Sequence, residues 1–216
     1  MAKVVVLDAM GVIYKAGDDV GELLIPFARR NGSDAPDSVI GELYLDCSLG
    51  DSTPKKLWRA LSLWSDDRDL DTEYLKGHEL TPGLLNFLKS MRAKNIPVAC
   101  ISNDVAEWSA KLRKMHGLEE YISSWTISGD VGFRKPNEEI FEHFARATGF
   151  LYGDCLFIDD RVRNLDAARE LGFQTLLYSA DSSPSGFIDH PMISSFHNLA
   201  DNDILGNLPN AGRDYV

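Results

Sequence analysis

Six polar side chains stand at or just after short apolar runs of the sequence, and their types suit the transfer of a phosphoryl group. They are Asp8, Ser102, Asn103, Lys135, Asp159 and Asp160. Crowded carboxylates repel one another unless a cation compensates them, and oxygen ligands of this kind suit Mg²⁺. A metal and a lysine would neutralise phosphoryl charge. A carboxylate nucleophile would divide the reaction into two steps through an aspartyl-phosphate.

Each of these residues also has an ordinary structural role open to it. An aspartate after a strand commonly forms a turn or caps a helix. The Ser102-Asn103 pair can be a turn, and a lone lysine such as Lys135 is usually solvated. Four such elements in this order, each at the end of a strand, are difficult to explain together by turn chemistry. The set therefore predicts a site.

Five apolar runs rich in β-branched residues predict strands, at residues 3–7, 96–101, 124–127, 155–158 and 174–178. They are apolar throughout, which is typical of strands buried on both faces of a parallel sheet. Helical patterns at 84–91, 136–148 and 165–171 separate them. This alternation predicts an α/β fold, a Rossmann-like parallel sheet flanked by helices, with ligands bound beyond the carboxyl ends of the strands.

The interval 17–77 interrupts this alternation, because it contains helical patterns and no convincing buried strand. We predict a small helical cap subdomain at 16–78, inserted into an α/β core formed by 1–15 and 79–216. The segment after Ala180 is rich in turn-forming residues, and its pattern does not specify an element.

The pattern resembles the haloacid dehalogenase superfamily, specifically its subfamily I, whose members carry a helical C1-type cap after the first strand. The resemblance covers nearly the whole chain up to Ala180. Its motifs are specific only as an ordered set. They are LDAMGVI at 7–13, ISN at 101–103, KP at 135–136, and FIDD at 157–160 with Asn164.

The resemblance implies a role for each matching residue. Asp8 would be the nucleophile and a Mg²⁺ ligand, and the backbone carbonyl of Met10 would bind the same ion. Asp160 would be a direct metal ligand, with Asp159 either a ligand or behind it. The remaining implied roles are Ser102 holding a phosphoryl oxygen with Asn103 beside it, Lys135 bridging nucleophile and phosphoryl group, and Asn164 supporting the site by hydrogen bonding.

Met10 is a departure from the family pattern, because phosphatases of this superfamily usually carry a general acid/base aspartate at this position. A thioether cannot move a proton. Three readings stay open: a Mg²⁺-dependent phosphohydrolase acting on a small phosphorylated metabolite, a dehalogenase- or phosphonatase-type hydrolase on the same site, and a non-catalytic phosphate-binding protein. The paired acids Asp159 and Asp160 favour phosphate chemistry. Candidate substrate contacts from the cap are Lys55, Trp58 and Arg59, although Trp58 also suits the core of the cap.

The formal net charge of −11 argues against nucleic acid or an anionic membrane as a partner. Residues 1–7 enter an apolar run without the pattern of a secretory signal, and the chain contains no apolar run of transmembrane length. The three cysteines form no metal-binding or disulfide pattern. We therefore expect a cytoplasmic enzyme that is a monomer or a homodimer, with a small phosphorylated molecule as its partner.

Overall fold

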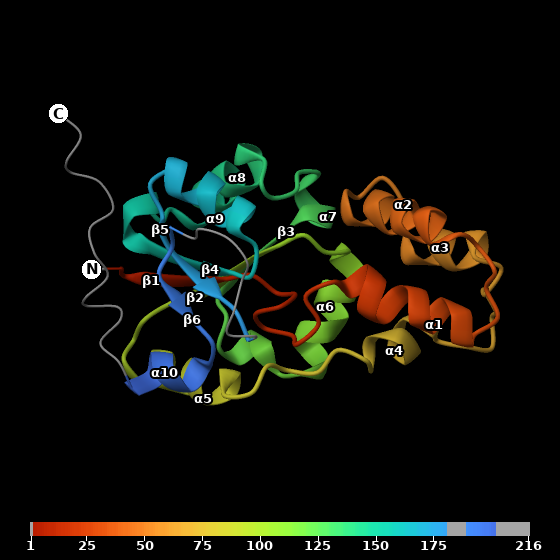
Figure 1. Ribbon diagram of the computed structural model, residues 1–216, viewed down its shortest axis with the longest axis horizontal. Coiled ribbons are helices and arrows are strands. Elements are labelled where there is room, and N and C mark those ends of the chain that lie inside the picture. The colour runs from red at the N-terminus through yellow and green to blue at the C-terminus, as the bar shows by residue number, and fades with distance from the viewer. Residues whose placement is uncertain (1, 181–188, 202–216) are drawn as a thin grey trace.

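A six-stranded parallel sheet forms the centre of the molecule in the computed structural model, which describes residues 2–180 and 189–201 (Figure 1). The strand order is β3-β2-β1-β4-β5-β6, which confirms the predicted parallel sheet and places β1 between β2 and β4. The strands are β1 (Val4–Leu7), β2 (Val98–Ser102), β3 (Ser124–Ile127), β4 (Cys155–Asp159), β5 (Gln174–Tyr178) and β6 (Met192–Ile193).

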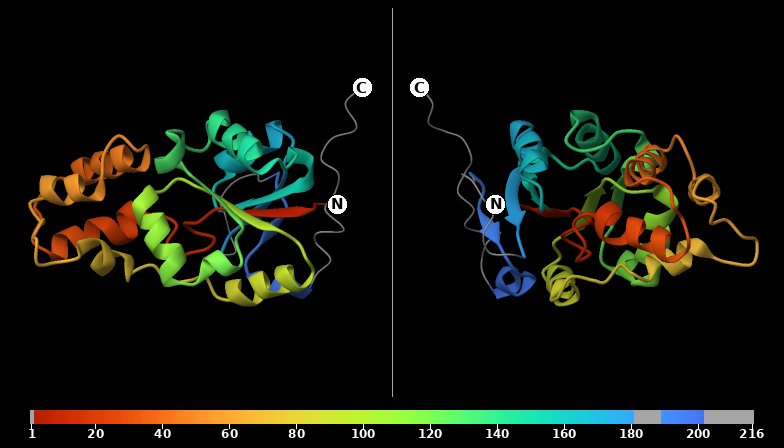
Figure 2. Two further views of the ribbon diagram at one scale, coloured as in Figure 1. Left: turned by 180° about the vertical axis from the view of Figure 1, so that it is seen from behind. Right: turned by 45° about the vertical axis from the view of Figure 1, so that its right-hand side comes forward.

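Helices cover both faces of the sheet (Figure 2), which explains why β1 is apolar on every residue and the other long strands are largely buried. Val5 and Leu7 of β1 pack into one core cluster, and Val4 and Val6 pack into the other. The first cluster includes buried residues of α5 (Leu84–Ala93), α6 (Ala106–Met115) and α10 (Phe196–Asp201). The second includes those of α8 (Glu138–Thr148) and α9 (Val162–Glu170). Short helical turns are η2 (Leu118–Glu120), α7 (Ser128–Val131) and η3 (Tyr152–Asp154).

A group of helices between β1 and α5 occupies one end of the molecule, at the right of Figure 1. We call it the 19–75 helices. Thr53 caps the helix that begins at Pro54, because its side chain accepts a hydrogen bond from the backbone N–H of Lys56. The members are η1 (Asp19–Leu24), α1 (Ile25–Arg30), α2 (Asp37–Ser48), α3 (Pro54–Ala60) and α4 (Leu70–Leu75).

One carboxylate joins these helices to the sheet-covering helix α6. Asp71 Oδ1 accepts hydrogen bonds from the indole N–H groups of Trp58, at 2.7 Å, and Trp108, at 2.9 Å. Its Oδ2 accepts from Lys111 Nζ at 2.7 Å. The rings of Trp58 and Trp108 lie 5.6 Å apart between centroids, so α3, α4 and α6 meet at a single point.

Three elements differ from the sequence-based expectation. The helix α6 was not predicted, and β6 and α10 lie in the segment for which no element was predicted. Burial of Phe196 against Phe87 and Tyr178 holds α10 on the first core cluster. The turn-rich residues 181–188 lie outside the described residues.

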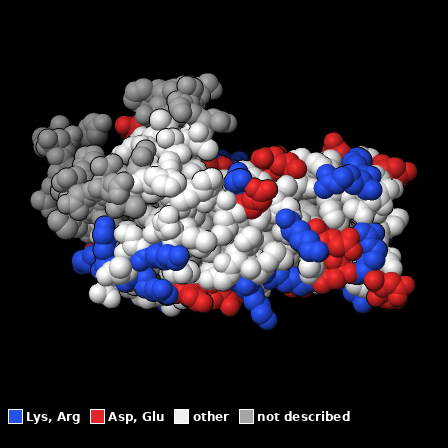
Figure 3. Space-filling view, turned by 90° about the horizontal axis from the view of Figure 1, so that it is seen from below, with Lys and Arg blue, Asp and Glu red and all other residues white. Residues whose placement is uncertain are grey.

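The charged side chains of the surface are of both signs (Figure 3), and the three cysteines are free. Acidic and basic side chains are interspersed over the 19–75 helices on the face shown in Figure 3, rather than forming a patch of one sign. Cys47, Cys100 and Cys155 are buried free thiols, and burial raises the pKa of Cys155 to about 12. No helix among the described residues is long and apolar enough to cross a membrane.

The aromatic packing under the sheet yields a prediction. Phe141 is fully buried, and its ring lies 5.6 Å from the rings of both Phe157 and Phe173. Phe141→Ala should lower the free energy of unfolding by about 3–5 kcal/mol, because it removes buried contacts and leaves a cavity. Urea unfolding would measure this loss. Leu151→Ala is the control, since Leu151 is 71% exposed. Equal losses for the two variants would contradict this account.

Candidate active site

The chemical side chains gather at the carboxyl ends of three neighbouring strands. Asp8 directly follows β1, Ser102 ends β2, and Asp159 ends β4. Leu7 pairs with Cys100 of β2 and with Ile158 of β4, so the register brings the three strand ends to the same edge of the sheet. The predicted convergence at this edge is what the sheet topology produces.

Lys135 lies at the centre of this edge, and it is 3% exposed. Its Nζ is 2.8 Å from Asp8 Oδ1 and 2.7 Å from Asp159 Oδ2, and it donates to the Ile101 carbonyl at 2.8 Å. Burial opposes the charge on Lys135, but Asp159 and Asp8 outweigh it and raise the pKa of the lysine. The side chain is therefore an ammonium that links two carboxylates.

The side chain of Asn103 positions Lys135 by binding the backbone of Lys135. The side-chain Nδ2 of Asn103 donates to the Lys135 carbonyl at 2.8 Å, and its Oδ1 accepts from the Lys135 N–H at 2.7 Å. This pair of bonds ties the end of β2 to the loop before α8. Ser102, by contrast, has a buried Oγ without a hydrogen-bond partner among the described residues, so this hydroxyl is available to a ligand.

Asp159 has its hydrogen-bonding capacity largely filled by the protein. Besides Lys135, its carboxylate accepts from the Arg161 N–H at 2.8 Å and from Asn164 Nδ2 at 3.0 and 3.1 Å. Both oxygens are therefore held in fixed positions. The side chain is fully buried, and it acts within this network as the counter-charge of Lys135.

Asp160 differs from its neighbour, because its Oδ1 is buried and has no hydrogen-bond partner among the described residues. Burial, and next the charge of Asp159, raise the pKa of Asp160 to about 6. Gly11 lies against it with a φ of +78°, and a Cβ at this position would come within 2.4 Å of Asp160 Oδ2. A side chain at position 11 would displace the Asp160 carboxylate. Glycine therefore allows both the positive φ of the backbone at this position and the observed place of the carboxylate.

Three carboxylates and one ammonium leave two negative charges uncompensated. Oxygens of Asp8, Asp159 and Asp160 all lie within 4.8 Å of one another. Burial raises the pKa of Asp8 well above its usual range, the charge of Lys135 opposes this, and the two neighbouring acids reinforce it. A divalent cation with oxygen ligands fits this donor set and Asp160 Oδ1, which accepts no hydrogen bond among the described residues and lies 3.8 Å from Arg161 Nε.

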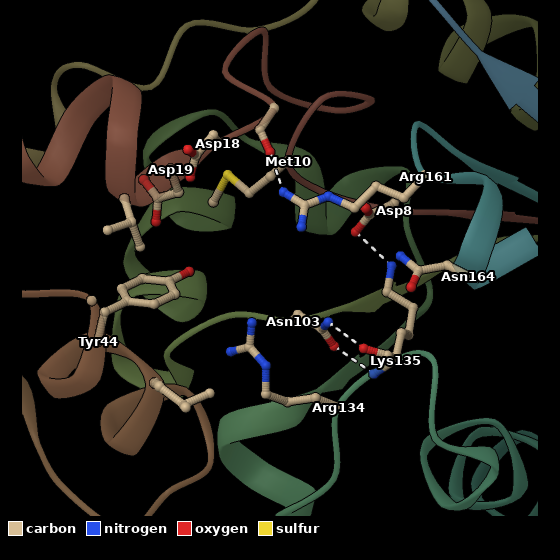
Figure 4. Close-up of a pocket in the computed structure, with 14 residues that line it drawn as sticks. Asp8, Met10, Asp18, Asp19, Tyr44, Asn103, Arg134, Lys135, Arg161 and Asn164 are labelled. Atoms are coloured by element: carbon tan, nitrogen blue, oxygen red, sulfur yellow. Dashed lines mark hydrogen bonds and ion pairs between the residues drawn. The ribbon is translucent and has the colours of Figure 1, made fainter. Parts of the chain in front are cut away.

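A cavity of about 290 Å³ opens between this cluster and the 19–75 helices (Figure 4). Met10, which is 7% exposed, lines it. Of the other residues singled out in the sequence, Asp8, Asn103, Lys135 and Asn164 also line it. Lining residues that the sequence reasoning missed include Asp18, Asp19, Tyr44, Arg134 and Arg161. Arg134 directly precedes Lys135, and Arg161 directly follows Asp160. Their places next to predicted site residues were the sequence signal that could have identified them.

The candidate substrate contacts of the helical segment lie elsewhere. Trp58 is 1% exposed and packs against Phe27, Tyr74 and Trp108. Lys55 and Arg59 both lie over the ring of Trp64, at 4.8 and 5.5 Å from its centroid. Lys55, Trp58 and Arg59 do not line the cavity.

Buried acids and a lysine at the carboxyl edge of an α/β sheet form the candidate site, and comparison with known proteins gives the family. Residues 2–172 match the model of the haloacid dehalogenase-like hydrolases. The chain therefore belongs to this family of enzymes, as the motifs predicted. No finding distinguishes its subfamily.

Curated relatives and solved structures agree with this assignment. Flavin mononucleotide hydrolase 1 of Arabidopsis thaliana is 31% identical over 130 residues, which are 57% of this chain and 52% of the plant protein. GMP/IMP nucleotidase YrfG of Escherichia coli is 25% identical over 66% of this chain and 68% of its own length. The matched region spans only about half the length of several such relatives.

A haloacid dehalogenase family enzyme of Bacteroides thetaiotaomicron, solved with magnesium and inorganic phosphate, has the same fold. Its TM-score is 0.69, with 22% identity over 86% of this chain and 98% of the other.

The raised pKa of Asp160 yields a second prediction. Folding raises the pKa of Asp160 from 3.8 to about 6, so the folded state favours the protonated carboxyl. This contribution to the free energy of unfolding is fully present below the unfolded pKa and is lost as pH rises through about 6. Asp160→Asn cannot ionise, so without metal at pH 8 it should be more stable than wild type by about 1–3 kcal/mol.

Urea unfolding at pH 8 and near pH 4 would measure this difference, which should be much smaller at the lower pH. Added Mg²⁺ should stabilise wild type but not the variant. A variant less stable than wild type at pH 8 without metal would refute the electrostatic argument.

Proposed function

We propose that this enzyme is a Mg²⁺-dependent phosphohydrolase that acts on a small phosphorylated metabolite through an aspartyl-phosphate at Asp8. The observation that carries the proposal is the buried cluster in which Lys135 joins Asp8 to Asp159, with Asp160 beside them, at the edge of the cavity. Several relatives are named for hydrolysis of phosphomonoesters, including the flavin mononucleotide hydrolase, the nucleotidase and a phosphoglycolate phosphatase of Nitrosococcus oceani.

In the first step, a carboxylate oxygen of Asp8 attacks phosphorus, and the bond from phosphorus to the leaving oxygen breaks. Lys135 neutralises charge on the nucleophile and the phosphoryl group, and the Ser102 hydroxyl donates to a phosphoryl oxygen. In the second step, water attacks phosphorus of the aspartyl-phosphate, which releases inorganic phosphate and restores Asp8. Asn103 and Asn164 keep Lys135 and Asp159 in place throughout.

We assign the metal to Asp8, Asp160 and the backbone carbonyl of Met10. Asp159 supports them, because its oxygens are already occupied by Lys135, Arg161 and Asn164. Bound Mg²⁺ would supply positive charge to the phosphoryl oxygens.

We further propose that residues 16–78 form a cap subdomain that closes the cavity. The 19–75 helices contribute Asp19, Tyr44 and Leu45 to its lining, opposite the catalytic edge. A closed cavity excludes water and strengthens the electrostatic interactions inside it. Lys55 and Arg59 would then act only if their stacking on Trp64 is released, and Trp58 would support the cap from within its core.

Replacement of the nucleophile is the direct test. Asp8→Asn should lower phosphate release by more than about 10³-fold, because an amide cannot form the acyl-phosphate and loss of a nucleophile has effects of this size in other enzymes. The measurement is phosphate release from a panel of phosphorylated metabolites with Mg²⁺, with thermal unfolding as the control for folding. Wild-type activity in the variant would exclude Asp8 as the nucleophile. Full phosphate release by wild type in chelator would exclude the metal from the reaction, whereas metal-independent release of halide from a haloacid, without phosphate release from any substrate, would favour the dehalogenase reading.

Met10 generates a prediction about leaving groups. General acid/base catalysis contributes about 10²–10⁴-fold, and a thioether provides none. Wild type should therefore hydrolyse aryl phosphates faster than alkyl phosphates, and a burst of product should precede slow release of phosphate. Met10→Asp should speed the hydrolysis of alkyl phosphates most. Stopped-flow assays with both substrate types would measure this. Fast alkyl phosphate turnover without any gain in the variant would show that another group supplies the proton.

A further inference from the structure

Arg134 is a half-buried cation that lines the cavity and forms no ion pair with a described carboxylate. It lies in the loop between α7 and α8, directly before Lys135. Its Nη1 donates to the hydroxyl of Ser48, the last residue of α2. Within the described part of the chain this is the one hydrogen bond of the Arg134 side chain. A neutral hydroxyl therefore holds the guanidinium in place without balancing its charge.

This state sets Arg134 apart from the other arginines of the described residues. Each of the others is exposed to solvent or pairs with a carboxylate. The half-buried ones are Arg113, Arg161 and Arg169, which pair with Glu119, Asp160 and Asp166. Burial of a charge is costly unless an opposite charge compensates it. A guanidinium that faces a cavity in this state indicates that a ligand supplies the anion.

The surroundings of Arg134 disfavour its charge further. Burial lowers the pKa of Arg134, and the charges of Arg161 and Arg163 add to this, whereas Tyr44 and Asp104 oppose it. Asp104 is a poor counter-charge, because burial raises its pKa to about 7. An arginine nevertheless stays protonated in proteins. An anion beside Arg134 would relieve both the cost of burial and the repulsion between the arginines.

The acids that line the cavity have partners of their own. Asp8 lies 2.8 Å from Lys135 Nζ, and Asp19 lies 2.9 Å from His78 Nε2. Asp18 caps η1 by accepting a hydrogen bond from the helix backbone. None of the three forms an ion pair with the guanidinium, so the positive charge there is available to a ligand.

The direction of the Arg134 side chain identifies the part of a ligand that would meet it. Lys135 turns to Asp8 at the end of β1, whereas Arg134 reaches Ser48 of α2. Figure 4 shows the Arg134 guanidinium pointing into the cavity, between Lys135 and Tyr44 in this view. A substrate whose phosphoryl group is at Asp8 would extend its leaving group toward Arg134. The two adjacent cations would therefore contact different ends of one molecule.

The chemistry of the guanidinium selects an anion. It has five N–H donors in a planar fork, and Ser48 accepts from only one nitrogen. The remaining donors can bind two oxygens of a carboxylate or a phosphate in parallel. A hydroxyl or an apolar group would fill the same space but leave the charge uncompensated.

We propose that Arg134 binds a second anionic group, a carboxylate or a further phosphate, on the leaving group, so that the preferred substrates are small phosphomonoesters with two anionic ends. This inference deepens the proposed function and rests on it. The selecting residue belongs to a loop of the α/β core rather than to the 19–75 helices. Arg161 adds positive charge to the same cavity.

The test compares substrates that differ in charge at the far end of the leaving group. ω-Carboxyalkyl phosphates with chains of three to five carbon atoms are paired with their uncharged amides, and alkanediol bisphosphates of the same lengths form a third series. With Mg²⁺, wild type should prefer a carboxylate or a bisphosphate over the amide of that length by roughly tenfold or more in kcat/KM. The series with the higher value identifies the anion.

Replacement of Arg134 should remove this preference. Arg134→Gln should lower the kcat/KM of the preferred substrate roughly tenfold to a hundredfold, and that of the amide by less than about threefold. Arg134→Lys keeps the charge without the fork and should retain part of the preference. Calorimetric binding of the matching phosphonates, which cannot be hydrolysed, should follow the same order. Thermal unfolding checks that each variant folds.

Arg163→Gln is the matched control, because Arg163 is exposed, influences Arg134 through its charge and does not line the cavity. It should leave the preference unchanged. Ser48→Ala removes the hydroxyl that contacts the guanidinium but keeps the guanidinium itself. The preference should survive in this variant as well.

Equal losses for the charged substrate and the amide in Arg134→Gln would overturn the inference, since Arg134 would then serve the phosphoryl group or the fold. No preference in wild type, or a loss in Ser48→Ala as large as in Arg134→Gln, would overturn it too. If Arg134→Gln does not fold, Arg134→Lys and the wild-type comparison decide. If no phosphomonoester is hydrolysed with Mg²⁺, the proposed function fails, and the phosphonates still show whether Arg134 selects an anion.

Discussion

The buried ammonium of Lys135 is the constraint on which the rest of the site depends. A charge with 3% exposure requires partners, and Asp8, Asp159 and the Ile101 carbonyl supply them from β1, β4 and β2. Removal of one partner of a buried ion pair costs about 3–5 kcal/mol, because the other charge stays buried. The lysine therefore joins the ends of three strands, whose register their backbone pairing sets, and Asn103 fixes the loop that carries the lysine. Stability and the geometry for chemistry have the same source.

Much of the fold and of the catalytic edge could be predicted, because the signals are local. The run at β1 is apolar on every residue, and such a strand has to be covered on both faces. Asp8 and Asp159 stand next to buried strands, so their place follows once the sheet is known to be parallel. The 19–75 helices could be predicted because the sequence between 17 and 77 contains helical patterns and no apolar run typical of a buried strand.

What could not be predicted depends on contacts between distant residues. In α6 only Trp108 and Leu112 are large buried apolar residues, and this sparse pattern does not mark a helix by itself. α10 follows a turn-rich segment, and its burial depends on Phe87, more than 100 residues away. Asp19 and His78 are 59 positions apart, and neither lies in a recognisable motif. The direction of the Arg134 side chain, toward the cavity, follows from packing that the sequence does not express.

The meeting of Trp58 and Trp108 at Asp71 has an optical consequence. The two indoles belong to α3 and α6, their rings are 5.6 Å apart, and both N–H groups bind one carboxylate oxygen. Both are 1% exposed, so solvent does not reach their rings while the helices are packed together. Separation of the helical segment from the sheet would bring water to the indoles and weaken the exciton coupling between them. The chain thus carries an intrinsic chromophore pair that reports opening without any attached label.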